Sequence, residues 1–326
     1  MTPFSRQLCT APMMDWSDRH CRYYFRQLSP HALVYTEMVT TGALIHGDVA
    51  RHLDFSPEEH PIGLQLGGSE PADLARAARL GAQRGFDEIN LNCGCPSERV
   101  QRGAFGACLM AEPELVADCV KAMCDAVSLP VTVKHRLGVD DIQHYEFVRD
   151  FVGTVALAGC RTFIVHARNA ILKGLSPKDN RSVPPLRYDD VYRLKRDFPA
   201  LQIIINGGIE SARQAHLHLE QVDGVMLGRT AYHHSYVLAE LEAQLFPADT
   251  PPPSRAAVLT HMLHYAKRQQ TPIRGVTRHL LGLFHGQPGA REIRRVLSDH
   301  QVLKHNDVAA LRRALDPWLE LDVSAV

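Results

Sequence analysis

Short apolar runs alternate with longer amphipathic stretches along the first 245 residues of the chain. Eight of these runs have the length and apolar content of β-strands, at residues 8–13, 32–37, 62–66, 87–91, 131–135, 162–166, 202–205 and 224–227. The stretches at 70–84 and 112–127 repeat apolar residues with helical period, and each carries acidic residues and a proline in its first turn. The pattern therefore predicts a β-strand followed by an α-helix, eight times in succession.

Several of the predicted strands are almost wholly apolar, as in Ile203-Ile204-Ile205. Such strands are typical of a parallel sheet that is covered on both faces. Eight β-then-α units within the first 245 residues match a (β/α)8 TIM barrel in size and order. A doubly wound open sheet is the alternative, but the first predicted strand is not followed by a G-x-G-x-x-G segment. We therefore predict the barrel.

The alternation stops at a proline-rich segment, 246–253, which ends in three consecutive prolines. Consecutive prolines form a stiff, extended connector and mark a natural domain boundary. Beyond them the sequence predicts only helices, at 254–269, 273–283, 289–299 and 307–315. We expect a barrel domain at 1–245, a linker at 246–253 and a helical domain at 254–326.

The charge is distributed unevenly between these two parts. The 326-residue chain has 36 basic and 36 acidic side chains, but residues 251–326 carry 11 Lys and Arg against 6 Asp and Glu. The helical part is therefore at +5, which leaves −5 for the remainder. A basic module on a mildly acidic body suggests a polyanionic partner, although an ordinary solvated helix surface has the same appearance.

The eight cysteines all lie in the first half of the chain, without C-x-x-C pairs or a zinc-finger spacing. Cys93, Cys95 and Cys108 are a conceivable metal set, but no fourth ligand accompanies them. The N-terminal residues lack the pattern of a signal peptide, and no apolar run reaches the length of a membrane span, roughly 18 residues. We therefore expect a cytoplasmic protein with reduced thiols, no membrane association and no obligate protein partner.

Polar residues and glycines follow every predicted strand. Active sites of (β/α)8 barrels lie at the carboxyl ends of the strands, so the residues at these positions are the candidates for chemistry. They are Pro12, Met13, Met14 and Asp15; Glu37; Gln65; Asn90, Asn92 and Cys95; Lys134, His135 and Arg136; His166 and Arg168; Asn206, Gly207 and Gly208; and Gly228 and Arg229. One such residue alone is more often structural than functional. Because all eight strands end in this way, we predict one shared site.

The last two strands carry the sharpest signal within this set. Asn206-Gly207-Gly208 places two glycines between a strand and a helix, so main-chain N–H groups can approach an anion, and Gly228-Arg229 repeats the arrangement with an added charge. Phosphate binding after strands seven and eight is a recurrent feature of these barrels. The two turns together favour a phosphorylated cofactor.

The turn Leu91-Asn92-Cys93-Gly94-Cys95-Pro96-Ser97 places two thiols immediately after the fourth predicted strand. Packing, metal binding and catalysis are all compatible with two cysteines in a tight turn. Its position on the predicted rim, opposite the glycine turns, favours catalysis.

Five segments resemble the tRNA-dihydrouridine synthase family. They are 11–22 (APMMDWSDRHCR), 91–97 (LNCGCPS), 166–170 (HARNA), 174–181 (GLSPKDNR) and 277–279 (TRH). The similarity runs through the barrel and the helical part, and the segment after His166 resembles subfamily A in particular. Ile171 departs from the aromatic residue that is common at its position.

The resemblance implies an FMN enzyme that reduces the C5–C6 bond of uridine in the tRNA D-loop, near positions 20 and 20a, with NADPH as electron donor. By position, Cys95 would be the proton donor, and Asn92 and Arg168 would contact the substrate. FMN would be held by Pro12, Met13, Met14, Gln65, Lys134, His166, Asn206, Gly207, Gly208, Gly228 and Arg229. Cys93 is expected to be structural.

A base buried in the site leaves most of the RNA outside it, so cations around the rim are expected to hold the tRNA. The candidates are Lys178 and Arg181 in the long segment after His166, and Arg278, Arg291, Arg294 and Arg295 in the helical part. Helical spacing places the last three on one face.

Two other functions use part of the same pattern. An FMN barrel acting on a free pyrimidine, of the dihydroorotate dehydrogenase type, would share the cofactor residues but needs no basic tail. An RNA-binding protein without activity would share the tail but needs no aligned Cys95, Lys134 and His166.

Overall fold

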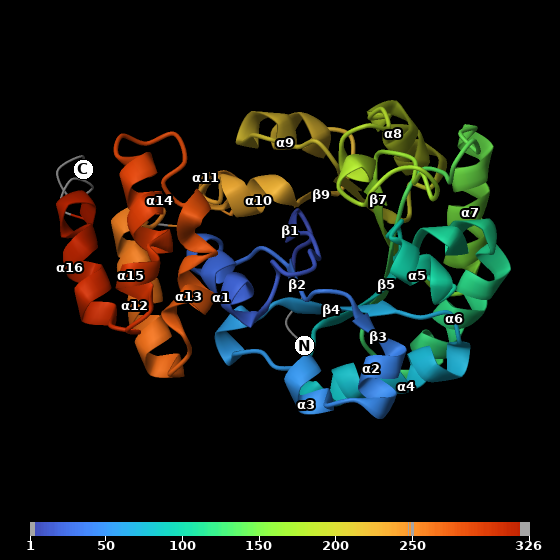
Figure 1. The fold of residues 1–326 in the computed structure, drawn as a ribbon. Helices are drawn as coiled ribbons and strands as arrows, with labels where there is room; N and C mark the ends of the chain where they lie inside the picture. The colour runs from blue at the N-terminus through green and yellow to red at the C-terminus, as the bar shows by residue number, and fades with distance from the viewer. Residues whose placement is uncertain (1–3, 247, 249–250, 320–326) are drawn as a thin grey trace.

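Eight parallel strands form the centre of the computed structural model, which describes residues 4–246, 248 and 251–319 (Figure 1). With one additional short strand, β3, the described strands are β1 (Leu8–Thr10), β2 (Val34–Tyr35), β3 (Val39–Thr40), β4 (Ile62–Gly67), β5 (Glu88–Cys93), β6 (Val131–His135), β7 (Thr162–His166), β8 (Gln202–Asn206) and β9 (Gly224–Leu227). Neighbours follow the order β1-β9-β8-β7-β6-β5-β4-β2, and β3 is an additional strand beside β4.

The sheet closes on itself between β1 and β2. Thr10 N–H donates to the Leu33 carbonyl (3.0 Å), and Leu33 N–H donates to the Leu8 carbonyl (3.0 Å), so the residue before β2 pairs with β1. The predicted (β/α)8 barrel is therefore confirmed. The second predicted strand, 32–37, is shorter than expected, because its regular ladder covers only Val34–Tyr35. The fourth is longer, since β5 continues through Asn92 and Cys93.

The helices surround the barrel and then continue beyond it. They are α1 (Arg19–Leu28), α2 (Thr41–His46), α3 (Val49–His52), α4 (Pro71–Arg84), α5 (Glu98–Arg102), α6 (Pro113–Ala126), α7 (Tyr145–Leu157), α8 (Tyr188–Asp197), α9 (Ala212–Leu219), α10 (Arg229–His233), α11 (Val237–Leu245), α12 (Arg255–Gln269), α13 (Ile273–Thr277), α14 (Ala290–Ser298), α15 (His300–Leu303) and α16 (Val308–Leu319). Short 3-10 turns occur at Pro57–Glu59, Gly106–Ala111, Asp179–Arg181 and Leu280–Gly282.

Local sequence fixes the ends of the barrel helices. In α4, Pro71 occupies the first position, where its missing N–H removes no bond, and Gly85 ends the helix with a left-handed φ of 98°. Leu74, Ala77 and Ala78 lie buried on the inner face of the helix. Burial of this stripe against the sheet, rather than helix propensity alone, stabilises the unit.

The barrel interior contains an apolar cluster and a polar network. The apolar cluster includes Cys9, Leu33, Ile164, Ile204 and Met226, all fully buried. The polar side chains form a continuous chain of hydrogen bonds: Arg6 to Glu88 (2.7 Å), Thr132 to Glu88 (2.6 Å), Asn90 to Thr132 (2.8 Å) and Gln65 to Asn90 (2.7 Å). Such groups are stable in the interior only when paired, and here each pairs with the next.

The described part of the segment after α11 consists of helices and the turns that connect them, and it packs beside α1 and α10 (Figure 1). Helix α12 agrees with the predicted 254–269 within one residue. The predicted helix at 273–283 is divided into α13 and a 3-10 turn, α15 was not predicted, and α16 extends to Leu319. Residues 247, 249 and 250 of the predicted linker and 320–326 of the predicted helical domain lie outside the described residues. Within the described ranges, no helix has the length and apolar character needed to cross a membrane.

Candidate active site

Cys95 lies in a sharp turn two residues after the end of β5. Asn92 Oδ1 accepts hydrogen bonds from the N–H groups of Gly94 (3.1 Å) and Cys95 (3.0 Å), which bends the chain directly after the strand. Ala107 N–H donates to the Cys95 carbonyl (2.9 Å) and holds the turn from the other side. Cys95 is partly exposed. The turn thus presents a positioned and accessible sulfhydryl group at the rim.

Cys93 has a different environment from Cys95. Its side chain is fully buried, and burial raises the pKa of this thiol well above its ordinary value. A buried, protonated thiol of this kind packs like a small apolar side chain, in agreement with the structural role predicted for it. Among the described residues, no cluster of His, Cys, Asp or Glu has the composition of a metal site.

Gln65 connects the Cys95 turn to the polar interior of the barrel. Its Oε1 accepts from Asn92 Nδ2 (2.8 Å) while its Nε2 donates to Asn90 (2.7 Å). Asn92 therefore uses its oxygen for the turn and its nitrogen for Gln65. The predicted substrate contact of Asn92 stays a prediction, and the turn-forming role is what the hydrogen bonds show.

Cations gather where β6 and β7 end. Lys134 Nζ donates to Asn206 Oδ1 (3.2 Å), and burial, together with repulsion from Arg136, lowers the pKa of this lysine to about 7. Burial likewise lowers the pKa of His166 well below its ordinary value, and the charges acting on it, from Arg136, Lys134, Arg168 and Arg229, are all positive. His166 is thus a neutral imidazole in a cationic pocket, the environment expected for an anionic ligand.

The two glycine turns border this pocket but differ in what they require. Gly207 and Gly208 have left-handed φ values of 110° and 69°. A Cβ at Gly207 would lie 2.5 Å from His166 Cδ2, and one at Gly208 would lie 2.5 Å from Leu186 Cδ1. At Gly228 the nearest atom to an added Cβ is Ala11 Cβ at 3.6 Å. Packing therefore demands glycine in the first turn, whereas the second has space beside its backbone.

The loop after β1 forms the third side of the rim. Met13 N–H donates to Ser17 Oγ (2.8 Å), and the Ser17 hydroxyl donates to the Met13 carbonyl (3.0 Å). Met13 is buried, whereas Met14 is 57% exposed. An exposed thioether on a hydrogen-bonded loop offers an apolar surface. Cofactor binding by Pro12, Met13 and Met14 stays a prediction.

Arg168 projects from the end of β7 toward the long segment that follows it. One of its Nη groups donates to the Pro184 carbonyl, while its Nε is buried and has no hydrogen-bond partner within the described part of the chain. A buried donor without a partner is costly unless a ligand or water satisfies it. The Arg168 Nε therefore has an unused hydrogen bond in this structure.

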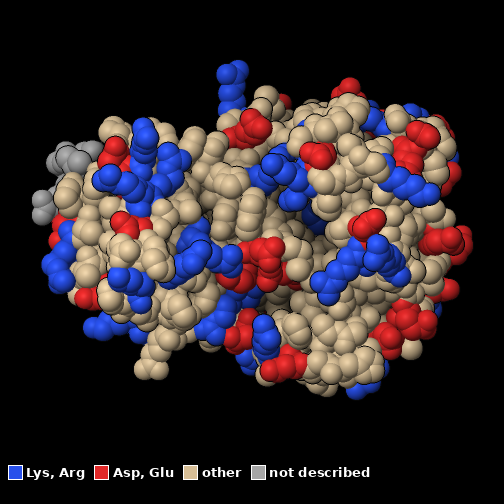
Figure 2. Space-filling view, viewed as in Figure 1, with Lys and Arg blue, Asp and Glu red and all other residues tan. Residues whose placement is uncertain are grey.

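The remaining predicted RNA contacts lie in the segment after β7 and on α14. Lys178 is exposed, and Arg181 donates to the Pro177 carbonyl (2.9 Å), while the Arg181 carbonyl accepts from Arg229 (2.9 Å). On α14, the exposed Arg291, Arg294 and Arg295 border one surface hollow. Figure 2 shows a cluster of Lys and Arg side chains over α14. The predicted shared face of these three arginines is thus present.

Two residues differ from their expected placement. His135 was expected at the rim, but neighbouring residues of a strand face opposite sides, so its ring packs against Phe151 (5.2 Å between centroids) in the helical layer. Arg278, a predicted tRNA contact, pairs with Asp18 and donates to the Asp15 carbonyl (2.7 Å), so the structure engages it inside the protein. Its contact with RNA stays untested.

Arg136 and Gln101 hold the rim loops together. Arg136 was predicted as a rim residue without a specific role, and Gln101 was not predicted. Arg136 is buried and donates to the carbonyls of Gly94 (3.1 Å), Asn169 (3.1 Å) and Asn180 (2.9 Å). Gln101 Nε2 donates to the carbonyls of Pro96 and Leu172 at 2.8 and 3.0 Å. Side chains alternate along a strand, which places Arg136 on the same side as Lys134, so the sequence contains a signal for Arg136. No comparable signal is evident for Gln101.

Comparison with known proteins agrees with this geometry. The sequence pattern of the family described as dihydrouridine synthase (Dus) matches residues 9–316. The chain belongs to the dihydrouridine synthase family. It is therefore an oxidoreductase, and its barrel rim is the place to look for the catalytic groups of the family.

Individual relatives match nearly the whole chain. The chain is 57% identical over 297 residues to the tRNA-dihydrouridine(20/20a) synthase of Pseudomonas aeruginosa, covering 90% of each protein. It is 53% identical over 325 residues to that of Vibrio cholerae, covering 98% of this chain and 99% of the relative. The corresponding protein of Escherichia coli K12 is 54% identical over 316 residues, covering 96% and 91%.

Proposed function

We propose that this protein reduces the C5–C6 double bond of uridines at positions 20 and 20a in the tRNA D-loop, with bound FMN and with NADPH as electron donor. The observation that carries the proposal is the meeting of an accessible thiol, Cys95, and a cationic pocket on one barrel rim. The relatives named tRNA-dihydrouridine(20/20a) synthase support the substrate and the positions.

The residues of the rim fit a flavin mononucleotide. The neutral His166 among Lys134 and arginines suits a phosphate, because the pocket supplies positive charge, and Gly207 and Gly208 add no side chain of their own to the turn that borders it. Asn206 and Arg229 lie in the same two turns, and Gly228 has space beside it. Met14, with Pro12 and Met13, would cover an apolar ring edge, and Gln65 would hydrogen-bond to it.

A bound FMN would supply the hydride for uracil C6. The thiol of Cys95 would then deliver a proton to C5, the role of a general acid. Asn92 would keep Cys95 in position, because its Oδ1 accepts hydrogen bonds from two backbone N–H groups of the turn. Arg168 would offer its unsatisfied Nε to the substrate.

In this proposal the two parts of the chain divide the work. Residues 1–245 form the catalytic barrel, 246–253 connect the parts, and 254–326 are a tRNA-binding domain. Lys178, Arg181, Arg291, Arg294 and Arg295 would contact the phosphate backbone. A cytoplasmic location follows from a tRNA substrate, and no obligate protein partner is needed.

The test is direct. The purified protein should be yellow from bound flavin and, with NADPH, should convert unmodified tRNA to tRNA carrying dihydrouridine at positions 20 and 20a. Mapping dihydrouridine in tRNA from cells with and without this protein should give the same two positions. Colourless protein, or modification at other positions only, contradicts the proposal. Reduction of free orotate or uracil without activity on tRNA would instead favour an enzyme of the dihydroorotate dehydrogenase type.

A further inference from the structure

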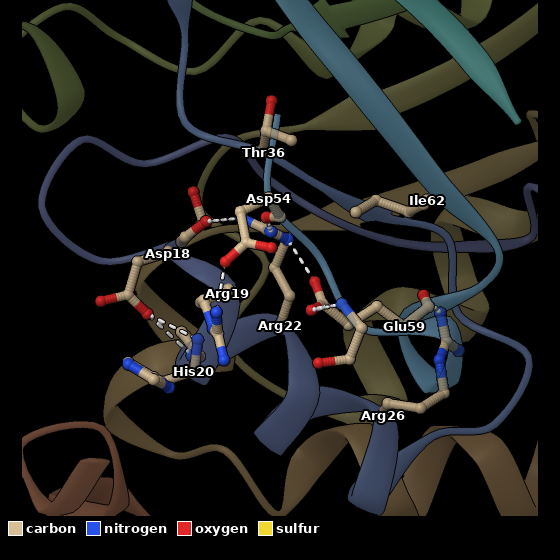
Figure 3. A network of polar contacts seen from close by, with 12 residues as sticks. Asp18, Arg19, His20, Arg22, Arg26, Thr36, Asp54, Glu59 and Ile62 are labelled. Carbon is tan, nitrogen blue, oxygen red and sulfur yellow. Dashed lines mark hydrogen bonds and ion pairs between the residues drawn. The ribbon is translucent and has the colours of Figure 1, made fainter. Parts of the chain in front are cut away.

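Three residues connect the helical region to the first loop of the barrel. Asp18 is the N-cap of α1, and its Oδ1 accepts from the N–H groups of His20 (3.0 Å) and Cys21 (2.9 Å) (Figure 3). Its Oδ2 accepts a hydrogen bond from Nη2 of Arg278 and lies 3.2 Å from Nε2 of His279. Arg278 and His279 both belong to the helical region. We refer to Asp18, Arg278 and His279 as the Asp18 cluster.

Arg278 also reaches the loop that ends at Asp18. Its Nη1 donates to the Asp15 carbonyl (2.7 Å), while Asp15 N–H donates to Glu37 Oε1 (2.5 Å) from the barrel. Asp15 has a left-handed φ of 65°, which is unfavourable for a residue with a side chain unless neighbours hold it. The two hydrogen bonds hold it from opposite sides, directly after the exposed Met14.

His279 connects the helical region to Trp16, the residue after Asp15, through Tyr232. It is buried, and its Nδ1 lies 3.1 Å from the hydroxyl of Tyr232. The ring of Tyr232 stacks on Trp16, with 4.4 Å between centroids and 11° between planes. Residues 15 and 16 are therefore both set by side chains anchored on the helical region.

The cluster is a stable one because its charges compensate each other. Burial by itself raises the pKa of the Asp18 carboxyl, but hydrogen bonds from His279, Cys21 N–H and Arg278 more than offset it and hold the pKa well below its ordinary value. Loss of Arg278 would leave a half-buried carboxylate short of a partner and the Asp15 carbonyl without its donor.

We propose that Arg278 is a positioning residue, which fixes the cofactor loop 12–15 from the helical region through Asp15 and Asp18. This inference rests on the proposed function, because the loop is a cofactor loop only if FMN binds there. It also gives the helical region a part in forming the active site, beyond holding RNA. The guanidinium serves two internal acceptors rather than a tRNA phosphate.

The experiment measures FMN affinity and tRNA affinity separately on the full chain. Flavin-free protein is titrated with FMN by fluorescence, and tRNA binding is followed over a range of salt concentrations. Arg278→Gln should weaken FMN binding about tenfold, the effect of one lost charge-assisted hydrogen bond, and leave the salt slope of tRNA binding unchanged. Arg278→Lys keeps the ion pair with Asp18, so its FMN affinity should lie between those of the wild type and Arg278→Gln. Arg312→Gln, an exposed arginine on α16, is the matched control and should bind FMN like the wild type.

Two results would overturn the inference. One is unchanged FMN affinity in a folded Arg278→Gln variant; the other is a salt slope shallower by about one with FMN binding intact, which makes Arg278 a phosphate contact. If Arg278→Gln does not fold, Asp18→Asn keeps the helix cap and removes the ion pair, and it should weaken FMN binding with a cooperative unfolding transition. If the wild-type protein binds no FMN, both the proposed function and this inference are refuted. If the wild type binds FMN and the variants bind it with the same affinity, only the inference is refuted.

Discussion

The cations of the barrel rim and those of α14 have the same sign but opposite surroundings. Lys134 and Arg136 lie inside the barrel rim, where burial lowers the pKa of the lysine to about 7 and that of the arginine to about 10. Arg291, Arg294 and Arg295 project from one helix into solvent. In Figure 2 the second group stands out on the surface, while Lys or Arg atoms in the barrel half lie inside a hollow.

The difference decides what each group can do. Charges in a poorly solvated site interact strongly with a partner at a fixed position, and salt screens them little. Exposed charges act over a distance of about 8 Å in physiological salt and tolerate many geometries. The rim is therefore suited to hold one anion and one reacting base, and α14 to hold the backbone of a long polyanion.

The strongest test of this division is Cys95→Ala. Loss of a general acid lowers rates by roughly 100- to 10,000-fold, so uridine reduction should fall by at least about 100-fold. Flavin reduction by NADPH and tRNA affinity should stay at wild-type values, because neither uses the thiol. Single-turnover flavin kinetics would measure flavin reduction by NADPH in the absence of tRNA and uridine reduction in its presence. Cys108→Ala is the control, and full dihydrouridine formation by Cys95→Ala would refute the assignment.

The complementary change is charge reversal at Arg291 and Arg295. The double Glu variant should bind tRNA at least about tenfold more weakly at low salt, with a salt slope reduced by about two, since each phosphate contact contributes about one. The rate at saturating tRNA should be unchanged. Filter binding across salt concentrations measures the slope, and the equivalent reversal of Arg312 and Arg313 on α16 controls for net charge. An unchanged slope would place the RNA elsewhere.

Lys134→Met should separate stability from binding. The folded protein depresses the pKa of Lys134 below that of the unfolded chain, so between about pH 7 and pH 10 the unfolded state binds more protons and the stability of the flavin-free protein rises with pH. The variant should lack this rise and be more stable near neutral pH by roughly 1–2 kcal/mol. Its FMN affinity should nevertheless fall about tenfold. Denaturant titrations at several pH values measure how the stability of the wild type and the variant depends on pH. A steeper pH dependence in the variant would contradict the expected loss of the rise.

The smallest effect is expected at Gly228. Gly228→Ala should change the free energy of unfolding by less than about 0.5 kcal/mol, because the added methyl meets nothing closer than 3.6 Å. Gly207→Ala, the contrast, should lose about 2 kcal/mol, since its φ is 110° and the methyl would meet His166. A several-fold loss of FMN affinity in Gly228→Ala, without loss of stability, would locate the ligand beside that backbone.

Periodicity was enough for the barrel because strand and helix patterns are local. The strands at 131–135, 162–166 and 224–227 have the predicted bounds, since each is an apolar run between turn residues. The second strand was predicted too long and β3 was missed, because the ladder there depends on which residues β4 offers as partners. The helix predicted at 273–283 is divided into α13 and a 3-10 turn, and Gly282 in that turn packs against the backbone of residues 232 and 233, where a Cβ would clash.

The sequence by itself determined the fold class, the family and the set of polar residues at the strand ends, because these depend on composition and order along the chain. Only the tertiary structure decided what those residues do to each other. It turned His135 outward and Lys134 inward, made Asn92 the acceptor that bends the Cys95 turn, and paired Arg278 with Asp18, 260 residues away. Side-chain partners, burial and the resulting pKa shifts arise from segments that meet only in the folded chain, and no local pattern specifies them.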